Sequence, residues 1–169
     1  TATVMSNIGL HKYLEEHGIG VDVTKVGDRY VLESMRQTGS VLGGEQSGHM
    51  IFLNYTTTGD GVLSSLQFMK AYLDSGKKLS ELRDEIQIYP QALVNARVDN
   101  AYKATALEDE EVKSFISEIE AKMEGSGRVL IRPSGTEPLI RVMLEGEDID
   151  EINGYAEQVA GLISDKFGK

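Results

Sequence analysis

The sequence contains no cysteine, which excludes disulfide bonds and thiolate metal sites. This absence suits a reducing compartment, and we expect a cytoplasmic protein. No stretch approaches the roughly 18 consecutive apolar residues that a membrane-spanning helix requires, so we expect no membrane association. The amino terminus shows no basic segment followed by an apolar one, and the sequence therefore predicts no signal peptide.

Basic residues are scarce, since 17 lysines and arginines stand against 27 aspartates and glutamates, for a net charge of −10. This balance argues against general binding to nucleic acid. One short stretch departs from it, because residues 126–142 hold three arginines and a single acid, Glu137. The arginines are Arg128, Arg132 and Arg141. A local basic island in an acidic half of the chain indicates an anion site.

The first half of the chain alternates short strands with helices. The pattern predicts strands at residues 1–6, 20–24, 41–42 and 50–53. It predicts helices at residues 9–17, 28–37 and 61–73. Such alternation is typical of βαβ units and of a mixed or mainly parallel sheet, which defines an α/β domain. The apolar face of the last of these helices is formed largely by Leu63, Leu66, Phe68 and Met69. Because few short strands are available, we expect this domain to be partial.

The pattern loosens between residues 74 and 90, where we place a domain junction that separates residues 1–85 from residues 86–169. The second half predicts three strands and two long helices. The strands are expected at residues 92–98, 127–131 and 138–145, and the helices at residues 108–123 and 149–167. Two strands joined by a tight loop form a hairpin, and two amphipathic helices can cover one face of the sheet. This pattern predicts a small α+β domain with an antiparallel sheet.

The loop of the predicted hairpin, residues 132–138, has the composition of a phosphate site. A phosphate dianion requires a planar guanidinium, hydroxyl donors and backbone N–H groups that turn inward. Arg132 can form a bidentate pair, Ser134 and Thr136 carry hydroxyls, and Gly135 lets the backbone approach closely. The alternative is an ordinary turn, because Pro, Ser and Gly are common in turns.

A second loop, residues 43–49, places polar side chains between glycines. The Glu45 carboxylate can accept hydrogen bonds from adjacent sugar hydroxyls, Ser47 can donate or accept, and His49 can meet a hydroxyl or a phosphate. Such a set suits a sugar ring, whereas the alternative is a glycine-rich connection with solvated side chains. No third ligand joins Glu45 and His49, so we expect no metal site in this chain.

Three further cations are auxiliary candidates for the phosphate, namely Lys25, Arg29 and Arg141, with ordinary solvated side chains as the alternative. Glu137 must point away from a bound phosphate. Asp60 is expected to cap the helix that follows it, because residues 56–61 lack the Gly-Lys-Ser/Thr ending of a P-loop.

At these residues the chain resembles the α-D-phosphohexomutase family, and within it the phosphoglucosamine mutase branch. Four stretches carry the resemblance, TVMSN at 3–7, KVGDRYV at 25–31, GEQSGH at 44–49 and RPSGTEP at 132–138. Their order and spacing fit across essentially the whole chain.

The resemblance implies a four-domain enzyme, with residues 1–85 forming most of its third domain and residues 86–169 its fourth. It implies that Glu45 and Ser47 hold sugar hydroxyls with His49 close by. It also implies that the non-reacting phosphate lies against Arg132, Ser134, Gly135 and Thr136. In the family, a phosphoserine of the first domain and a magnesium ion on an Asp-rich loop of the second carry out the transfer through a bisphosphate.

The sequence departs from the family in having neither a Ser-His-Asn-type nucleophile loop nor an Asp-Gly-Asp-x-Asp metal loop. We therefore expect a carboxy-terminal fragment of an isomerase that acts on glucosamine phosphate, inactive alone and dependent on the amino-terminal domains of its own polypeptide. Three alternatives remain at this point. They are a phosphomannomutase or phosphoglucomutase fragment, a non-catalytic phosphosugar-binding module, and a structural domain whose loops are only turns.

Overall fold

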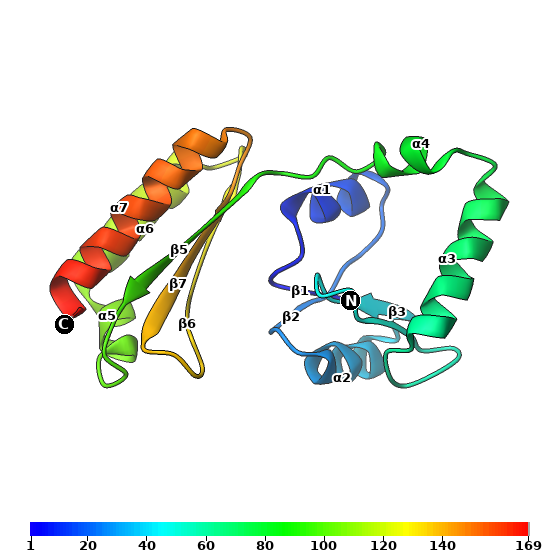
Figure 1. Ribbon diagram of the computed structural model, residues 1–169, viewed down its shortest axis with the longest axis horizontal. Helices are drawn as coiled ribbons and strands as arrows, with labels where there is room; N and C mark the ends of the chain where they lie inside the picture. Colours follow the sequence, from blue (N-terminus) through cyan, green and yellow to red (C-terminus); the bar gives the residue numbers. More distant parts are fainter. Residues whose placement is uncertain (169) are drawn as a thin grey trace. The chain divides into compact units, whose positions relative to one another are not determined.

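The computed structural model describes residues 1–168 (Figure 1). The chain divides into two compact units, Thr1–Ile88 and the part that begins at Tyr89. Among the described residues, none of the helices combines the length and the apolar character that a membrane crossing demands.

The first unit is built on a mixed four-stranded sheet with the strand order β2-β1-β3-β4. Its strands are β1 (Ala2–Thr3), β2 (Val23–Thr24), β3 (Leu42–Gly44) and β4 (Met50–Phe52). β1 pairs in parallel with β2 and β3, and β4 runs antiparallel to β3. The helices are α1 (Ile8–Glu16), α2 (Asp28–Thr38), α3 (Gly61–Ser75) and α4 (Leu79–Arg83). The predicted α/β class is confirmed, although the first two strands are shorter than predicted.

Local signals set the helix boundaries of this unit. The Asp60 side chain accepts from the first amides of α3, as predicted for its N-cap. Gly39 and Gly76 stand at the ends of α2 and α3 with φ values of 79° and 63°, in the left-handed region that favours glycine. These caps therefore fix where α3 begins and where α2 and α3 end.

The core of the first unit forms where α2 packs on the sheet. Val31 and Met35 are fully buried there together with Ile51 of β4. A β carbon added at Gly43 would lie 2.4 Å from the Met35 Sδ and 2.7 Å from the Val31 Cγ1. Only glycine therefore allows β3 to approach α2 this closely, and the end of β3 begins the loop of residues 45–49.

Gly43→Ala should lower the free energy of unfolding of the first unit by about 1–3 kcal/mol, the usual cost of overpacking a buried site. Urea unfolding followed by the amide signals of Val31 and Ile51 measures this change. Gly61→Ala is the matched control, because a β carbon at Gly61 meets no atom within 4 Å. Equal stabilities of the two variants would contradict the close packing of α2 on β3.

The structure does not bury the predicted apolar face of α3. No residue of this helix is buried among the described residues, and Leu66, Phe68 and Met69 are each at least half exposed. Helical periodicity identified the helix correctly, but a period describes which side chains share a face and not what packs against them.

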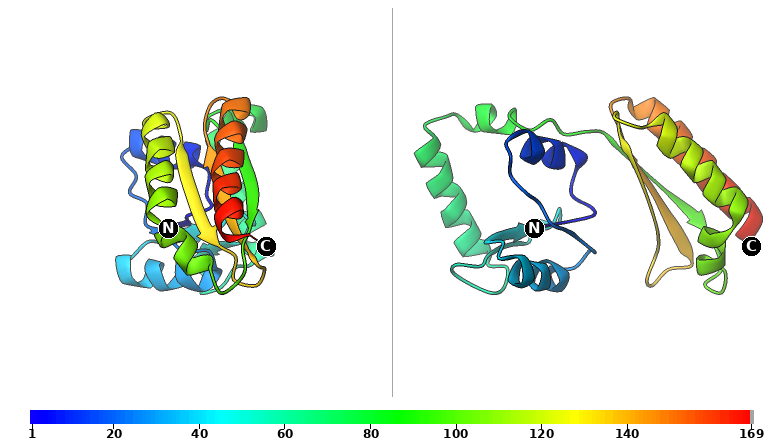
Figure 2. Two further views of the ribbon diagram at one scale, coloured as in Figure 1. Left: turned by 90° about the vertical axis from the view of Figure 1, so that its left-hand side faces the viewer. Right: turned by 180° about the vertical axis from the view of Figure 1, so that it is seen from behind.

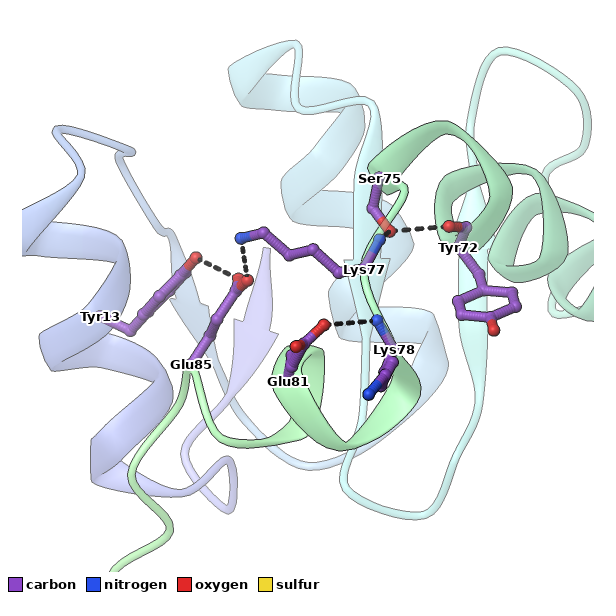
Figure 3. A network of polar contacts seen from close by, with 7 residues as sticks. All are labelled: Tyr13, Tyr72, Ser75, Lys77, Lys78, Glu81 and Glu85. Atoms are coloured by element: carbon purple, nitrogen blue, oxygen red, sulfur yellow. Dashed lines mark hydrogen bonds and ion pairs between the residues drawn. The ribbon is translucent and has the colours of Figure 1, made fainter.

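A polar network joins the segment after α3 to α1 (Figure 3). The Glu85 carboxylate accepts from the Tyr13 hydroxyl at 3.2 Å and from the Lys77 ammonium. The hydrogen bond from Lys77 lowers the pKa of Glu85 below its ordinary value, and the same bond raises the pKa of Lys77. Nearby, a β carbon at Gly9 would lie 1.7 Å from the Gln87 carbonyl oxygen, so the segment runs directly against α1.

The second unit is built on an antiparallel sheet with the strand order β5-β7-β6. Its strands are β5 (Gln91–Arg97), β6 (Arg128–Pro133) and β7 (Leu139–Glu145). Helices α6 (Glu110–Lys122) and α7 (Ile149–Phe167) lie side by side on one face (Figure 2). Ala96, Ile140 and Val142 are among the buried residues under these helices. The predicted antiparallel α+β domain with two helices on one face is confirmed.

The helix predicted at residues 108–123 is wrong at its beginning. A separate short helix, α5 (Lys103–Glu108), precedes α6, and the chain is extended at Asp109 between them. The Asp109 carboxylate caps α6 and also accepts from the Lys166 ammonium of α7 at 2.6 Å. An aspartate that caps the next helix favours the break, since capping residues compete with helix continuation.

Candidate functional site

The loop after β3 is a hydrogen-bonded turn. The Glu45 amide donates to the His49 carbonyl at 2.9 Å, and the Gly48 amide donates to the Glu45 carbonyl at 3.0 Å. Gly48 has a φ of 90°, which other residues rarely adopt. These two hydrogen bonds therefore fix the backbone of residues 45–49 in one conformation.

A cavity of about 460 Å³ lies beside this turn. Its lining consists of Thr3, Met5, Val26, Glu45, Gln46 and Ser47. The structure thus brings together two of the three predicted sugar-binding residues, Glu45 and Ser47. The volume falls within the range of small-molecule pockets, which is about 300–1,000 Å³. The other lining residues are Gln46 of the same loop and Thr3, Met5 and Val26 from two further segments, to which the sequence analysis gave no role in binding.

The Glu45 carboxylate is oriented by the segment before α2. Its Oε1 accepts from the Gly27 amide at 2.8 Å. Among the described residues, no hydrogen bond or ion pair engages the Oε2. One oxygen is therefore held by the protein while the other is available to a ligand in the cavity.

His49 lies apart from this cavity lining. Its Nε2 is 3.7 Å from the Asp28 Oδ2, and its side chain is 45% exposed. A β carbon added at Gly59 would lie 2.2 Å from the same nitrogen. Asp28 and Gly59 therefore set the position of the imidazole, and the structure does not group His49 with Glu45 and Ser47.

Gly59→Ala should displace the His49 ring and leave the cavity residues in place. We expect large changes in the His49 ring signals in an NMR spectrum and little change at Glu45 and Ser47. Because the imidazole is half exposed and can move outward, the stability should change by less than about 1 kcal/mol. Gly20→Ala is the control, since a β carbon there meets no atom within 4 Å. Unchanged His49 signals in Gly59→Ala would contradict this packing.

The two auxiliary cations of the first unit do not line the cavity. The Arg29 Nε donates to the Glu33 Oε1 at 2.8 Å on the surface of α2, where the arginine side chain is 79% exposed. Lys25 is exposed, and no acceptor for its ammonium exists among the described residues. The structure therefore places Arg29 in a surface ion pair.

The loop between β6 and β7, residues 132–138, is closed by hydrogen bonds of its own. The Ser134 amide donates to the Leu139 carbonyl at 2.9 Å, and the Glu137 amide donates to the Ser134 Oγ at 3.2 Å. Ser134 is buried, so its hydroxyl oxygen supports the loop from inside. The hydroxyl proton remains available for a further acceptor.

Two amides and one guanidinium of this loop have no protein partner. Within residues 1–168, no group accepts from the Gly135 amide, the Thr136 amide or the Arg132 side chain. Successive backbone N–H groups in a turn form concavities that bind anions. The loop therefore presents two N–H groups and a free guanidinium within five consecutive residues.

Two positively charged side chains lie close together beside the loop and repel each other. Arg132 and Arg141 are directly opposite each other in the β6–β7 ladder, so their side chains leave the same face of the sheet. Like charges in this arrangement destabilise a sheet. The Glu137 Oε2 accepts from an Arg141 nitrogen at 2.9 Å, so this carboxylate pairs with Arg141. Arg132 keeps an uncompensated charge that an anion would neutralise.

The predicted basic island is smaller than the sequence suggested. Arg128 lies at the opposite end of β6 from the loop, where it faces Glu145 in the ladder and forms an ion pair with it. The sequence could not distinguish this arginine from the other two, because its partner lies 17 residues away on the next strand.

No metal centre can be built from the described residues, since no three histidine, aspartate or glutamate side chains among them gather closely enough to hold an ion.

Comparison with known families gives the class of protein. The profile described as "Phosphoglucomutase/phosphomannomutase, alpha/beta/alpha domain III" matches residues 1–89. The profile for the C-terminal domain of the same family matches residues 93–162. The chain belongs to the phosphoglucomutase/phosphomannomutase family, which confirms the resemblance to the phosphohexomutases.

Two individual proteins of this family are similar to the chain over nearly its whole length. The chain is 55% identical over 166 residues to the phosphoglucosamine mutase of Streptococcus gordonii and 56% identical over 165 residues to that of Caldicellulosiruptor saccharolyticus. Both alignments cover 98% of the chain and 37% of the relative, so the chain spans little more than a third of their length.

The fold is also that of a solved structure. An N-acetylphosphoglucosamine mutase from Aspergillus fumigatus superimposes with a TM-score of 0.80 at 19% identity. That match covers 97% of the chain and 38% of the fungal protein. At this identity the likeness shows the fold alone.

Proposed function

We propose that this chain is the substrate-binding portion of a phosphoglucosamine mutase, an isomerase that interconverts glucosamine 6-phosphate and glucosamine 1-phosphate. Its identity of 55% and 56% to two phosphoglucosamine mutases supports this substrate class over phosphomannose or phosphoglucose. In the proposal, residues 1–85 bind the sugar and residues 86–169 bind the phosphate that does not react.

The phosphate is held by the loop of residues 132–138. The Arg132 guanidinium can pair with two phosphate oxygens, and the Gly135 and Thr136 amides can donate to the dianion. The hydroxyls of Ser134 and Thr136 complete the set of donors. Charge-assisted hydrogen bonds of this kind are roughly twice as strong as neutral ones.

The sugar is held by Glu45 and Ser47 at their shared cavity. Because the Gly27 amide fixes one Glu45 oxygen, the other is free to accept from two adjacent hydroxyls. His49, whose imidazole lies against Asp28 and Gly59, is proposed to lie close to the bound sugar although it does not line this cavity.

These two loops suit a reaction in which the sugar must be bound in two orientations. When the bisphosphate intermediate reorients in the site, C1 and C6 exchange places. The O3–O4 pair still offers two adjacent hydroxyls to the Glu45 carboxylate. Likewise, the loop of residues 132–138 binds a dianion whichever carbon carries it. Positioning and electrostatic stabilisation are what phosphoryl transfer chiefly requires of a protein.

The phosphoserine and the magnesium ion of the proposed cycle are assigned to other domains of the same polypeptide. Magnesium bound there would neutralise charge on the phosphoryl group during transfer. The chain by itself is proposed to bind the sugar phosphate without converting it.

The observation that carries the proposal is the free Arg132 guanidinium beside the free Gly135 and Thr136 amides. A two-dimensional amide NMR titration with glucosamine 6-phosphate tests it, with inorganic phosphate and glucose 6-phosphate as comparison ligands. All three ligands should shift the Gly135 and Thr136 signals, and only the sugar phosphates should also shift Glu45 and Ser47. The absence of shifts in both loops at millimolar ligand would refute the proposed binding role.

A further inference from the structure

We propose that Lys103 is a positioning residue that holds the phosphate loop, residues 132–138, in its anion-binding conformation. This inference rests on the proposed function of that loop. Nothing in the local sequence around Lys103 indicates such a role, since the residue lies outside both candidate loops.

Lys103 joins α5 to the two ends of the loop tip. It is the first residue of α5, and its Nζ donates to the Ser134 carbonyl at 2.8 Å and to the Glu137 carbonyl. These two carbonyls bracket Gly135 and Thr136, whose amides are free among the described residues. One side chain thus contacts both sides of the predicted anion site.

The planarity of the peptide bond turns this contact into control of the Gly135 amide. The Ser134 carbonyl and the Gly135 N–H belong to one trans peptide unit, so they point in opposite directions. When Lys103 holds the carbonyl, the N–H must face away from the ammonium. Glycine has wide conformational freedom, and this unit could otherwise rotate and present its carbonyl oxygen to the anion.

The Lys103 contact also prevents electrostatic repulsion at the site. A carbonyl oxygen that faced a bound phosphate dianion would repel it, whereas the ammonium keeps both bracketing carbonyls turned toward itself. Among the described residues, no carboxylate pairs with Lys103, so its positive charge is not cancelled close to the loop. The side chain is half-buried, which reduces screening of that charge by water.

The alternative is that Lys103 only fastens α5 to the hairpin. The two roles differ in what they predict for the folded chain. A fastening role lowers the stability and leaves the phosphate affinity of folded molecules unchanged. A positioning role lowers the affinity and changes the Gly135 amide even in molecules that remain folded.

The test compares Lys103→Met with the wild-type 169-residue chain, using inorganic phosphate as the probe. Methionine keeps an unbranched apolar stem but has no donor. We expect about tenfold weaker phosphate binding, equivalent to about 1.4 kcal/mol. The Gly135 and Thr136 amide signals of the ligand-free variant should shift and exchange faster with solvent. Lys103→Arg should recover most of the affinity, because the guanidinium can also donate to two carbonyls.

Lys113→Met is the matched control, because Lys113 lies in the same unit and pairs with Glu108 on the surface. It should bind phosphate like the wild type. If Lys103→Met also binds phosphate like the wild type, the positioning role is wrong while the proposed function stands. If the wild-type chain itself fails to bind phosphate, the proposed function fails, and this inference fails with it.

Discussion

Arg128→Ala should lower the free energy of unfolding of the second unit by about 3–5 kcal/mol, the cost of leaving a buried charge without its partner. The charge in question is the Glu145 carboxylate, whose residue is 0% exposed at the end of β7. Arg128 pairs with its Oε2, and the Gln91 side-chain amide donates to its Oε1 at 3.1 Å. The Gln91 amide is neutral and does not replace the positive charge of the guanidinium. Urea unfolding followed by the amide signals of Ile140 and Val142 measures the loss.

Two controls separate the ion pair from simple loss of contacts. Replacing Arg128 and Glu145 together with methionine should recover much of the stability, because apolar pairs of similar volume often match buried ion pairs. Lys122→Ala removes an exposed pair with Glu118 and should cost less than about 1 kcal/mol. If Arg128→Ala unfolds at the same urea concentration as Lys122→Ala, the buried pair does not stabilise this unit.

Arg132→Ala should weaken phosphate binding by about 10- to 150-fold, which corresponds to the 1.5–3 kcal/mol of a hydrogen bond to a charged group. Its stability should stay close to that of the wild type, or rise, because the substitution removes a like charge from opposite Arg141. An amide NMR titration with inorganic phosphate gives the affinity, and thermal unfolding gives the stability.

Arg29→Ala is the appropriate comparison for Arg132→Ala, since Arg29 forms an exposed pair with Glu33 on α2. It removes the same charge from the chain and should leave phosphate binding unchanged. Equal weakening by both substitutions would mean that net charge governs binding and that the loop forms no specific site. Unchanged binding in Arg132→Ala would remove the arginine from the site altogether.

The sequence predicted the elements whose signals are local. The helix at residues 149–167 matches α7, and the hairpin of β6 and β7 was predicted from two apolar runs around a Pro- and Gly-containing loop. Asp60, as the cap of α3, was also predicted correctly. The break at Asp109 was missed because aspartate fits both a helix and a cap. In the structure its carboxylate accepts from the Glu111 and Val112 amides and from Lys166 of α7.

The candidate site was predictable only in part for the same reason. Residues within one loop, such as Arg132 and Thr136, could be recognised from composition. Partners that come from elsewhere could not be recognised. Gly27 orients Glu45 from 18 residues away, and Lys103 contacts Ser134 from 31 residues away. The sequence likewise grouped Arg128 with Arg132 and Arg141, because its pairing with Glu145 depends on the register of β6 and β7.

The ladder register that places Arg132 opposite Arg141 also restricts how the phosphate loop can change its length. Side chains alternate between the two faces of a strand, so a shift of β6 by one residue would turn Arg132 toward the helices and Ile131 away from them. The buried face opposes such a shift, and an inserted or deleted residue must be accommodated entirely between Pro133 and Ile140. That interval is already fixed by the Ser134–Leu139 hydrogen bond and by Lys103 at both ends of the tip. Among homologous proteins, this loop can therefore change by substitution far more readily than by insertion or deletion.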